Sequence, residues 1–453
     1  MKKFSLILLF VSSILISKTR DEIIKDIKDQ DIIAVDFVFS DILGNIKTVK
    51  IPAQTVPSIL KSGLKFDGSS VPGCSEITSS DMHLEPDLNT WRLVPSILSN
   101  APQGLIICDV CISENEPYQG DPRQMLKTTT NKLKENGIRF LTGVELEFYL
   151  LDENDDPCDE DHYFDFSGNL KLNDLIMAFF EAFNEARIDV VKEHHEVSIG
   201  QFEFVLGHND ALEVADQVLL AKYLIKTIAA KYALKANFMA KPIYGINGSG
   251  MHIHYSIYDE LNHRNLFYDA DKELYLSDNA LSFIAGNLKH IRDLSSLFNG
   301  TVNSYKRLVP GYEAPIFICW GSKNRSSLIR IPLVNKEDAN AVRAEIRCPD
   351  PKCNPYLALH GLLISGLNGI ENNLVPVNSV SKNLYKLIAN EIAELNIQSL
   401  PSNLKEAINC FENSEFVNSN FNSTFISQFL KLKKSELRSF ETAVTDWEIE
   451  SYS

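Results

Sequence analysis

The stretch Gly143-Val144-Glu145-Leu146-Glu147-Phe148 alternates between apolar and acidic residues after its first glycine. In a β-strand, side chains two residues apart share a face. The three apolar side chains would therefore pack into a core, while Glu145 and Glu147 point together to the opposite side. This pattern predicts a strand that presents a pair of carboxylates away from its core.

Three further stretches show the same alternation: HHE at 194–196 running on to QFE at 201–203, MHIHYS at 251–256, and RAEIR at 343–347. Each would bury its apolar side chains and turn metal-binding or cationic side chains the other way. If these strands are neighbours, their polar faces meet in one cavity. The residues predicted to converge there are Glu145, Glu147, Glu196, Glu203, Glu345, His252 and His254, with Ser256 on the same face as the two histidines.

So many carboxylates repel one another unless cations lie among them, which predicts a site for hard divalent metals. Carboxylates favour Mg²⁺ or Mn²⁺, and imidazoles shift the preference slightly toward Mn²⁺. The alternative is that the glutamates form ordinary exposed strand faces with solvated charges. One such strand would fit that alternative, but four strands with the same pattern favour a metal site.

Length and charge limit the class of protein. A chain of 453 residues is too long for one compact core and suggests two domains. Its net charge of -16 argues against nucleic-acid binding by phosphate neutralisation. Eight cysteines without a disulfide-like spacing suit a reducing compartment, and we interpret Cys108 and Cys111 as apolar filler rather than a zinc or redox pair.

Strand-like segments dominate residues 32–112, and long helical patterns appear after a polar segment at 114–120. The expected division is a small N-terminal domain at 18–117 and a large α+β domain at 121–453, whose strands bear the site and whose helices pack outside. Asp121-Pro122 provides the N-cap and first residue of a helix. The other expected helices lie at 20–29, 172–186, 211–233, 276–298 and 355–371, and residues 404–452 are expected to be mostly helical.

Residues 1–17 form an apolar leader with two lysines directly after Met1, as in the first regions of a signal peptide. The leader has no Ala-x-Ala cleavage pattern, and its apolar run is too short to span a bilayer comfortably. The alternative is that translation begins near Ile16 and that the leader is an extension of the gene model.

Arginines cluster in the last third of the chain, in NSYKR at 303–307, NRS at 324–326 and LIRIP at 328–332, and then at Arg343 and Arg347. A single arginine is usually part of a surface ion pair. Several together bind carboxylates or phosphates bidentately and stabilise a phosphoryl group in transfer. With divalent metals and without a P-loop motif, they predict phosphoryl transfer from a metal–nucleotide complex.

Three glycine-containing segments could approach a ligand or close over it. FDGSS at 66–70 places Asp67 in a turn where an active-site loop is plausible. PGYEAP at 310–315 brackets Glu313 between glycine and proline, as a flap would. NGSG at 247–250 lets a ligand come close to the backbone.

Six motifs in order resemble those of bacterial type I glutamine synthetase: FDGSS at 66, GxExEF at 143, HHEV at 194, NGSGMHxH at 247, NSYKRLVPGYEAP at 303 and NRS at 324. The resemblance extends from about Ser17 to Tyr452. It implies a small β-grasp-like domain, a catalytic domain with a curved antiparallel sheet, and twelve subunits in two hexameric rings with sites between neighbours. Because residues 17–20 resemble the usual family start, a misassigned start is favoured over secretion. A cytoplasmic protein without a membrane partner is expected.

The resemblance also implies roles for individual residues. One metal is implied at Glu147, Glu196 and Glu203, and a second, beside the nucleotide phosphates, at Glu145, His252 and Glu345. Glutamate is implied to bind at Asn247, Gly248, Arg307, Arg325 and Arg347. The ATP-side positions are His254, Ser256, Arg330 and Arg343. Asp67 is implied to help deprotonate ammonium in a neighbouring subunit's site, and Glu313 to shield the intermediate.

The reaction that the resemblance implies begins when ATP converts the side chain of L-glutamate to a γ-glutamyl phosphate. Metals and Arg325 would offset the developing charge. Asp67 would draw a proton from ammonium to give nucleophilic ammonia, and the closed flap would exclude water. The products would be L-glutamine, ADP and phosphate.

Two regulatory features of the family lack their usual residues. Lys386-Leu387-Ile388 replaces the usual Asp-Leu-Pro after Tyr385, so adenylylation of Tyr385 is not expected. Glu76 stands where feedback-inhibited members carry arginine. The rival functions are a related ligase that joins glutamate to an amine or polyamine and a catalytically silent structural relative. Asp67 and Glu313 favour ammonium, because a bare cation needs carboxylates around it.

Overall fold

The computed structural model describes residues 18–75, 80–387, 389–394 and 397–453. The expectations for the leader at 1–17 and for Glu76 fall outside these residues. None of the described helices is long and apolar enough to cross a membrane.

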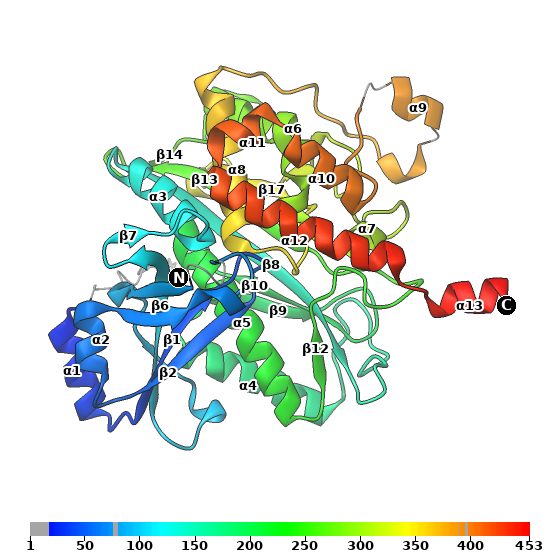
Figure 1. Cartoon of the computed structure of the whole chain (residues 1–453). Helices are drawn as coiled ribbons and strands as arrows, with labels where there is room; N and C mark the ends of the chain where they lie inside the picture. The colour runs from blue at the N-terminus through cyan, green and yellow to red at the C-terminus, as the bar shows by residue number, and fades with distance from the viewer. Residues whose placement is uncertain (1–17, 76–79, 388, 395–396) are drawn as a thin grey trace, which may run out of the picture.

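The N-terminal part of the chain folds around a small mixed sheet (Figure 1). Its elements are α1 (Arg20–Asp29), β1 (Ala34–Ser40), β2 (Ile46–Pro52), α2 (Val56–Ser62), β3 (Leu64–Asp67), β4 (Asp81–Pro86), β5 (Arg92–Leu93), β6 (Gln103–Ser113) and β7 (Glu116–Pro117). The strand order is β2-β1-β6-β4-β3, and β5 and β7 pair with β6. Helix α1, which the sequence predicted, buries Ile23 and Ile27 in the same core as the sheet.

The rest of the chain is built on a larger, mainly antiparallel sheet. Its strands are β8 (Ile138–Leu151), β9 (Val190–His195), β10 (Gln201–Leu206), β11 (Asn209–Asp210), β12 (Lys235–Asn237), β13 (Met251–Asp259), β14 (Arg264–Asn265), β15 (Trp320–Ser322), β16 (Ile329–Ile331) and β17 (Ala344–Ile346). The main order is β15-β16-β17-β13-β8-β10-β9. The strands predicted to carry the site are therefore consecutive neighbours, from β17 to β9.

The apolar face of β8 packs as its alternation predicts. Val144, Leu146 and Phe148 are buried in the main hydrophobic core. The Phe148 ring lies edge-on to Phe179, with centroids 6.4 Å apart, and stacks on Phe204 at 6.1 Å. A slip of one residue would expose these rings and bury the glutamates, so the core fixes which face of the strand carries the site.

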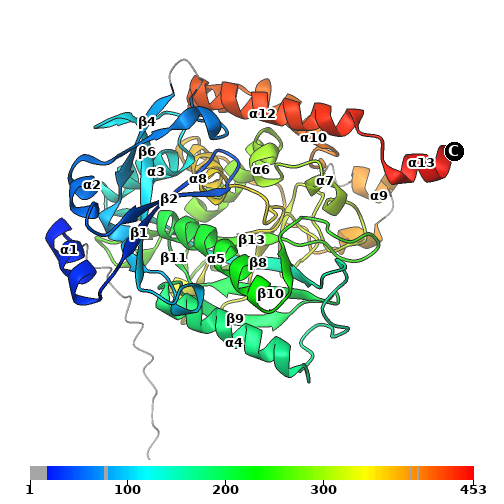
Figure 2. The same cartoon turned by 60° about the horizontal axis from the view of Figure 1, so that its bottom comes forward.

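Helices surround this sheet, and Figure 2 shows α4 and α5 side by side against it. The helices are α3 (Pro122–Lys134), α4 (Leu170–Glu185), α5 (Ala211–Lys231), α6 (Asp278–Phe298), α7 (Ser304–Arg307), α8 (Pro355–Glu371), α9 (Ala389–Glu394), α10 (Leu404–Glu412), α11 (Glu415–Asn420), α12 (Ser423–Thr442) and α13 (Asp446–Tyr452). The predicted helices are confirmed with small shifts at their ends. Helix α6 begins at Asp278 rather than near residue 276, because the Ser277 side chain accepts the N–H of Ala280 as an N-cap.

An ion cluster joins the two sheets. Arg123 of α3 lies at its centre and bonds to Asp87, Asp109 and Asp216, which come from the end of β4, from β6 and from α5. Lys127 adds a second cation, 2.9 Å from Asp87 and 2.6 Å from Asp109. These five residues, called the Arg123 cluster below, fix the small sheet against the helices of the large one.

Candidate active site

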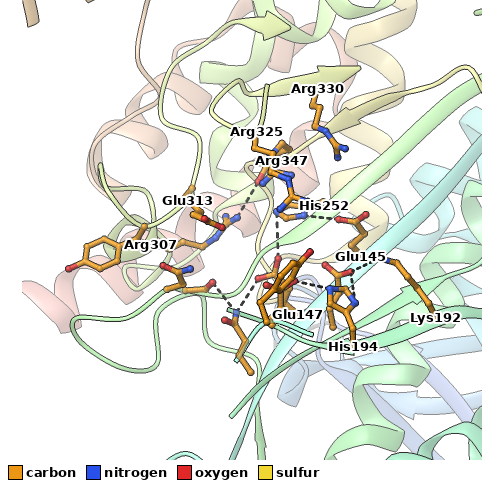
Figure 3. A pocket seen from close by; sticks show the side chains of 18 residues that line it. Glu145, Glu147, Lys192, His194, His252, Arg307, Glu313, Arg325, Arg330 and Arg347 are labelled. Carbon is orange, nitrogen blue, oxygen red and sulfur yellow. Dashed lines mark hydrogen bonds and ion pairs between the residues drawn. The ribbon is translucent and has the colours of Figure 1, made fainter. Parts of the chain in front are cut away.

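The polar face of the large sheet lines a pocket of about 170 Å³ (Figure 3). Figure 3 shows Arg325, Arg330 and Arg347 across the pocket from Glu147 and His194. The sequence-predicted residues that line it are Glu145, Glu147, Glu196, Glu203, Asn247, Gly248, His252, Arg307, Glu313, Arg325, Arg330 and Arg347. Carboxylates and guanidinium groups thus meet in one concave space, which suits a ligand that carries both metal ions and anionic groups.

Strand register assembles the acidic part of the pocket. His252 on β13 is the partner of Glu145 on β8, and Glu203 on β10 is the partner of Glu147 on β8. On its other side, Glu203 is the partner of His194 on β9. Directly opposed side chains on antiparallel strands have Cβ atoms about 5 Å apart. The pairing of distant segments, rather than one local motif, therefore concentrates the carboxylates.

Crowding of like charges disturbs the carboxylates strongly. Burial and the nearby Glu196 raise the pKa of Glu147 to about 8. Burial and the charges of Glu145, Glu147 and Glu196 raise the pKa of Glu203 to about 10. Burial would also raise the pKa of Glu145, but hydrogen bonds with His252 and His254 hold it well below its usual range. The protein's own cations therefore do not offset burial and repulsion at Glu147 and Glu203.

Among the residues that the structure describes, the donor atoms form three groups in which a cation could contact at least three residues. They are Glu145 with Glu203 and His252, Glu145 with His254 and Glu345, and His194 with Glu196 and Glu203. Within each group the donor atoms lie within 4.8 Å of one another. Carboxylate oxygens with one imidazole form a hard donor set, which fits Mg²⁺ or Mn²⁺.

This grouping overlaps with the predicted ligand sets without matching them, because Glu345 groups with His254 rather than with His252, and Glu147 is in none of the three groups. Glu147 is held by the protein, because its Oε2 accepts the N–H of Gly250 at 2.7 Å and the amide of Gln201 at 3.2 Å. His194 takes its place beside Glu196 and Glu203. The predicted metal role of Glu147 stays a prediction, and 3.7 Å separate its Oε1 from Nε2 of His252.

The arginines are tied to the acidic groups and to the backbone. Glu345 is completely buried, and its two oxygens lie 2.5 Å from Arg330 Nη1 and 2.7 Å from Arg347 Nη1. The charge of Arg347 outweighs the effect of burial and lowers the pKa of Glu345 to about 2. Arg307 is buried and donates to the carbonyl oxygens of Cys348 and Arg347, at 2.7 and 3.1 Å. These contacts hold the side chains in place before any ligand binds.

The other predicted ATP-side residues lie behind the pocket lining. His254 Nε2 lies 2.9 Å from Glu145, and Arg343 Nε donates to His254 Nδ1 at 3.2 Å. Ser256 is buried further along β13. His254 is thus placed among candidate metal donors as well as at the predicted nucleotide side.

Asp67 and Glu313 differ in their placement. Glu313 lines the pocket at the tip of the flap, residues 310–315. Asp67 is exposed on the small domain, where its carboxylate accepts the N–H of Ser69 at 2.9 Å, and it does not line this chain's pocket. A role for Asp67 in a neighbouring subunit's site stays a prediction.

The pocket contains residues that the sequence did not single out as ligands: Tyr163, Lys192, His194, Gln201 and Tyr312. His194 and Gln201 lie in the stretches whose alternation was recognised, so the register of β9 and β10 could have found them. Tyr163 comes from a loop before α4 and has no local signal. Only the folded chain brings it to the site.

Tyr385 has a partly buried ring in the short turn at residues 384–386. Burial raises the pKa of its phenol to about 12. The expectation that this hydroxyl is not adenylylated stays a prediction.

Known proteins are similar to this chain in sequence and in fold. The glutamine synthetase beta-grasp domain model matches residues 31–113, and the catalytic-domain model matches residues 119–452. The chain belongs to the glutamine synthetase family. The glutamine synthetase of Methanosarcina mazei is 39% identical over 440 residues, which is 96% of this chain and 97% of that protein. The Thermotoga maritima enzyme is 38% identical over 440 residues, covering 96% and 99%.

Solved structures agree with this family fold. A GmaS/ADP complex matches with a TM-score of 0.85 at 28% identity, over 95% of this chain and 98% of that one. Plasmodium falciparum glutamine synthetase matches with a TM-score of 0.85 at 26% identity, over 96% and 99%. The predicted fold, a β-grasp domain followed by a catalytic domain, is confirmed.

Proposed function

We propose that the protein is a glutamate–ammonia ligase, which forms L-glutamine, ADP and phosphate from L-glutamate, ammonium and ATP through a γ-glutamyl phosphate. The main observation behind this proposal is that crowded carboxylates and several arginines face each other in the same pocket. Relatives named glutamine synthetase, 38–39% identical over nearly the whole chain, support the same reaction.

Metal ions belong on the acidic face. Glu145, Glu196, Glu203 and His252 would hold two or more Mg²⁺ or Mn²⁺ ions, together with Glu345 and Glu147. When bound, these ions would act as Lewis acids on the phosphoryl oxygens of ATP and would neutralise charge as the phosphoryl group moves. Burial and like-charge repulsion raise the pKa values of Glu147 and Glu203, and this supports the assignment because a divalent cation would offset the repulsion.

The arginine side of the pocket would bind the anionic substrates. Arg307 and Arg347 would grip glutamate with the backbone and amide groups of Asn247 and Gly248, while Arg325 would contact the transferred phosphoryl group. Arg330 and Arg343 would lie on the ATP side, with His254 and Ser256. Held donors of this kind stabilise charge without reorganising during the reaction.

The ammonium site would be completed by a second copy of the chain. Asp67 is exposed and does not line its own pocket, which supports a role across a subunit interface. We therefore propose a homo-oligomer, a dodecamer of two hexameric rings, built from domains at 18–117 and 121–453. ATP dependence favours the cytoplasm as its compartment.

The test is ADP release by the purified protein with Mg²⁺, ATP and glutamate, in which ammonium is compared with methylamine, ethanolamine and putrescine. Strong dependence on ammonium, with glutamine as the product, is expected. Release driven only by an amine would overturn the acceptor and favour an amine ligase with the same first step. No release with any acceptor, from correctly assembled oligomers, would support the catalytically silent relative.

A further inference from the structure

Lys241 is a buried ammonium group beside the pocket that the reaction does not yet use. Only 9% of the residue is exposed. Its Nζ donates to the carbonyl oxygen of Ile246 and lies 3.6 Å from the centroid of the Tyr312 ring. Among the described residues, no carboxylate lies within ion-pair distance of it. A buried charge without a counter-ion is costly, so the contact with the ring must offset part of that cost.

The backbone of Lys241 is fixed independently of its side chain. Its N–H donates to Asn303 Oδ1 at 2.8 Å, and Asn303 Nδ2 donates back to the Lys241 carbonyl at 2.9 Å. Asn303 directly precedes α7, whose last residue, Arg307, lines the pocket. Lys241 therefore projects its ammonium from an anchored position on the catalytic domain.

The flap at residues 310–315 needs such a contact. Gly311 and Glu313 have φ angles of 97° and 59°, and the latter is uncommon for a residue with a side chain. Tyr312 lies between them and is only half-buried. A short segment with a strained, exposed tip has few contacts of its own to keep it over a pocket.

We propose that Lys241 is a positioning residue that latches the flap shut by holding the Tyr312 ring, and thereby keeps Glu313 over the pocket. This inference rests on the proposed function. While the flap is shut, ammonia is the nucleophile that reaches the acyl phosphate. When the flap opens, water attacks instead, the bond between the γ-carboxyl group and phosphate breaks, and glutamate and phosphate are released. Each such event converts ATP and water to ADP and phosphate without forming glutamine.

The test measures ADP and glutamine in the same reaction. Wild-type protein should form about one ADP per glutamine if the acyl phosphate is protected. In Lys241→Met, which keeps the aliphatic stem and loses the charge, the open flap should become about tenfold more populated, the factor that a loss of about 1.4 kcal/mol produces. ADP per glutamine should therefore rise several-fold. Lys241→Arg keeps a cation over the ring and should restore much of the coupling.

A second pair of variants tests the same contact from the flap. Tyr312→Leu should uncouple the reaction as Lys241→Met does, whereas Tyr312→Phe, which keeps the ring, should not. The double variant should be no worse than either single variant, because both remove one contact. The matched control is Lys226→Met, since Lys226 is an exposed residue of α5 that lies over the Phe238 ring, outside the pocket.

Three outcomes would overturn the latch. Equal losses of ADP and glutamine formation in Lys241→Met would show a purely structural role. A higher KM for glutamate with unchanged coupling would show that Lys241 acts through the loop at Asn247. Intact coupling in Tyr312→Leu would overturn the latch even if Lys241→Met failed to fold. Failure of the proposed function is distinct, because the wild-type protein would then form no glutamine at all.

Discussion

Two buried groups of charges in this protein are built in opposite ways. In the Arg123 cluster, three aspartates share two cations, and every carboxylate contacts at least one of them. Although burial would raise the pKa of Asp87, the charges of Arg123 and Lys127 hold it well below its usual range. In the pocket, burial and neighbouring carboxylates raise the pKa of Glu203 to about 10.

The difference separates a structural cluster from a functional one. Carboxylates that each contact a cation fix one geometry and leave no demand for a ligand, as the contact of Asp216 with both Arg123 and the Tyr356 hydroxyl illustrates. Unbalanced carboxylates destabilise the free protein and so create a demand for cations. The same residue types, aspartate or glutamate beside arginine, therefore have different consequences according to the balance of charge.

The largest effect should come from removing the central cation of the balanced cluster. Arg123→Met would leave Asp87, Asp109 and Asp216 buried near one another, with only Lys127 as a cation. We expect a loss of about 3–5 kcal/mol in unfolding free energy, the usual result of removing one partner of a buried ion pair. Chemical denaturation of the metal-free protein measures it. Arg264→Met is the control, since the exposed side chain of Arg264 pairs with Asp259 away from this cluster, and equal shifts in both variants would contradict the comparison.

The next effect concerns the unbalanced cluster and should separate activity from stability. Glu203→Gln should lower glutamine formation at least about a hundredfold, because metal ions supply several kcal/mol of charge stabilisation. The metal-free variant should nevertheless be as stable as wild type or more stable by about 0.2–1 kcal/mol, since Glu203 is directly opposite Glu147.

Rate assays and denaturation of the same Glu203→Gln sample provide both numbers. Glu260→Gln, at an exposed carboxylate outside the pocket, should leave both unchanged. A Glu203→Gln protein that lost stability as severely as Arg123→Met would show that the acidic face is structural.

The smallest expected effect is the change in stability of the wild-type protein at mildly acidic pH. Because the folded-state pKa of Asp87 is depressed, its contribution to stability is complete above the unfolded pKa, about 3.9, and is lost as the pH falls through the folded value. Lowering the pH from 7 to 5 should therefore cost the wild-type cluster almost nothing. Circular dichroism during acid titration tests this. In Arg123→Met the acid transition should change shape, and a wild-type cluster that weakened between pH 7 and 5 would contradict the account.

Alternation was enough to predict the site strands and their buried faces. Apolar residues such as Leu146 and Ile253 stand at every second position of their strands and are buried. The side chains between them, such as Glu145 and His252, must therefore point to the other face. Strand neighbours could not be derived from the pattern itself, because β8, β10 and β13 are separated by long helices. The prediction assumed that these strands are neighbours in the sheet, and the structure confirms it.

Contacts between distant segments were the part that the sequence could not supply. Arg123 follows a helix-start signal and has no local sign that three aspartates surround it. Lys241 and Tyr312 are 71 positions apart, and no periodicity links them. The Glu147 hydrogen bond from Gly250 likewise depends on how β8 pairs with the chain at the start of β13. Local sequence patterns predict which face of a strand is buried, whereas the partners of each charge in a cluster can be known only from the folded chain.

The most direct test of this account is a calorimetric titration of Mn²⁺ into the metal-free protein, with wild type, Glu203→Gln and Glu260→Gln compared. We expect two or more ions per wild-type chain, the same number for Glu260→Gln, and at least one fewer, or much weaker binding, for Glu203→Gln. Wild-type protein that bound no Mn²⁺, or Glu203→Gln protein that bound it as wild type does, would contradict the claim that the crowded carboxylates form a metal site.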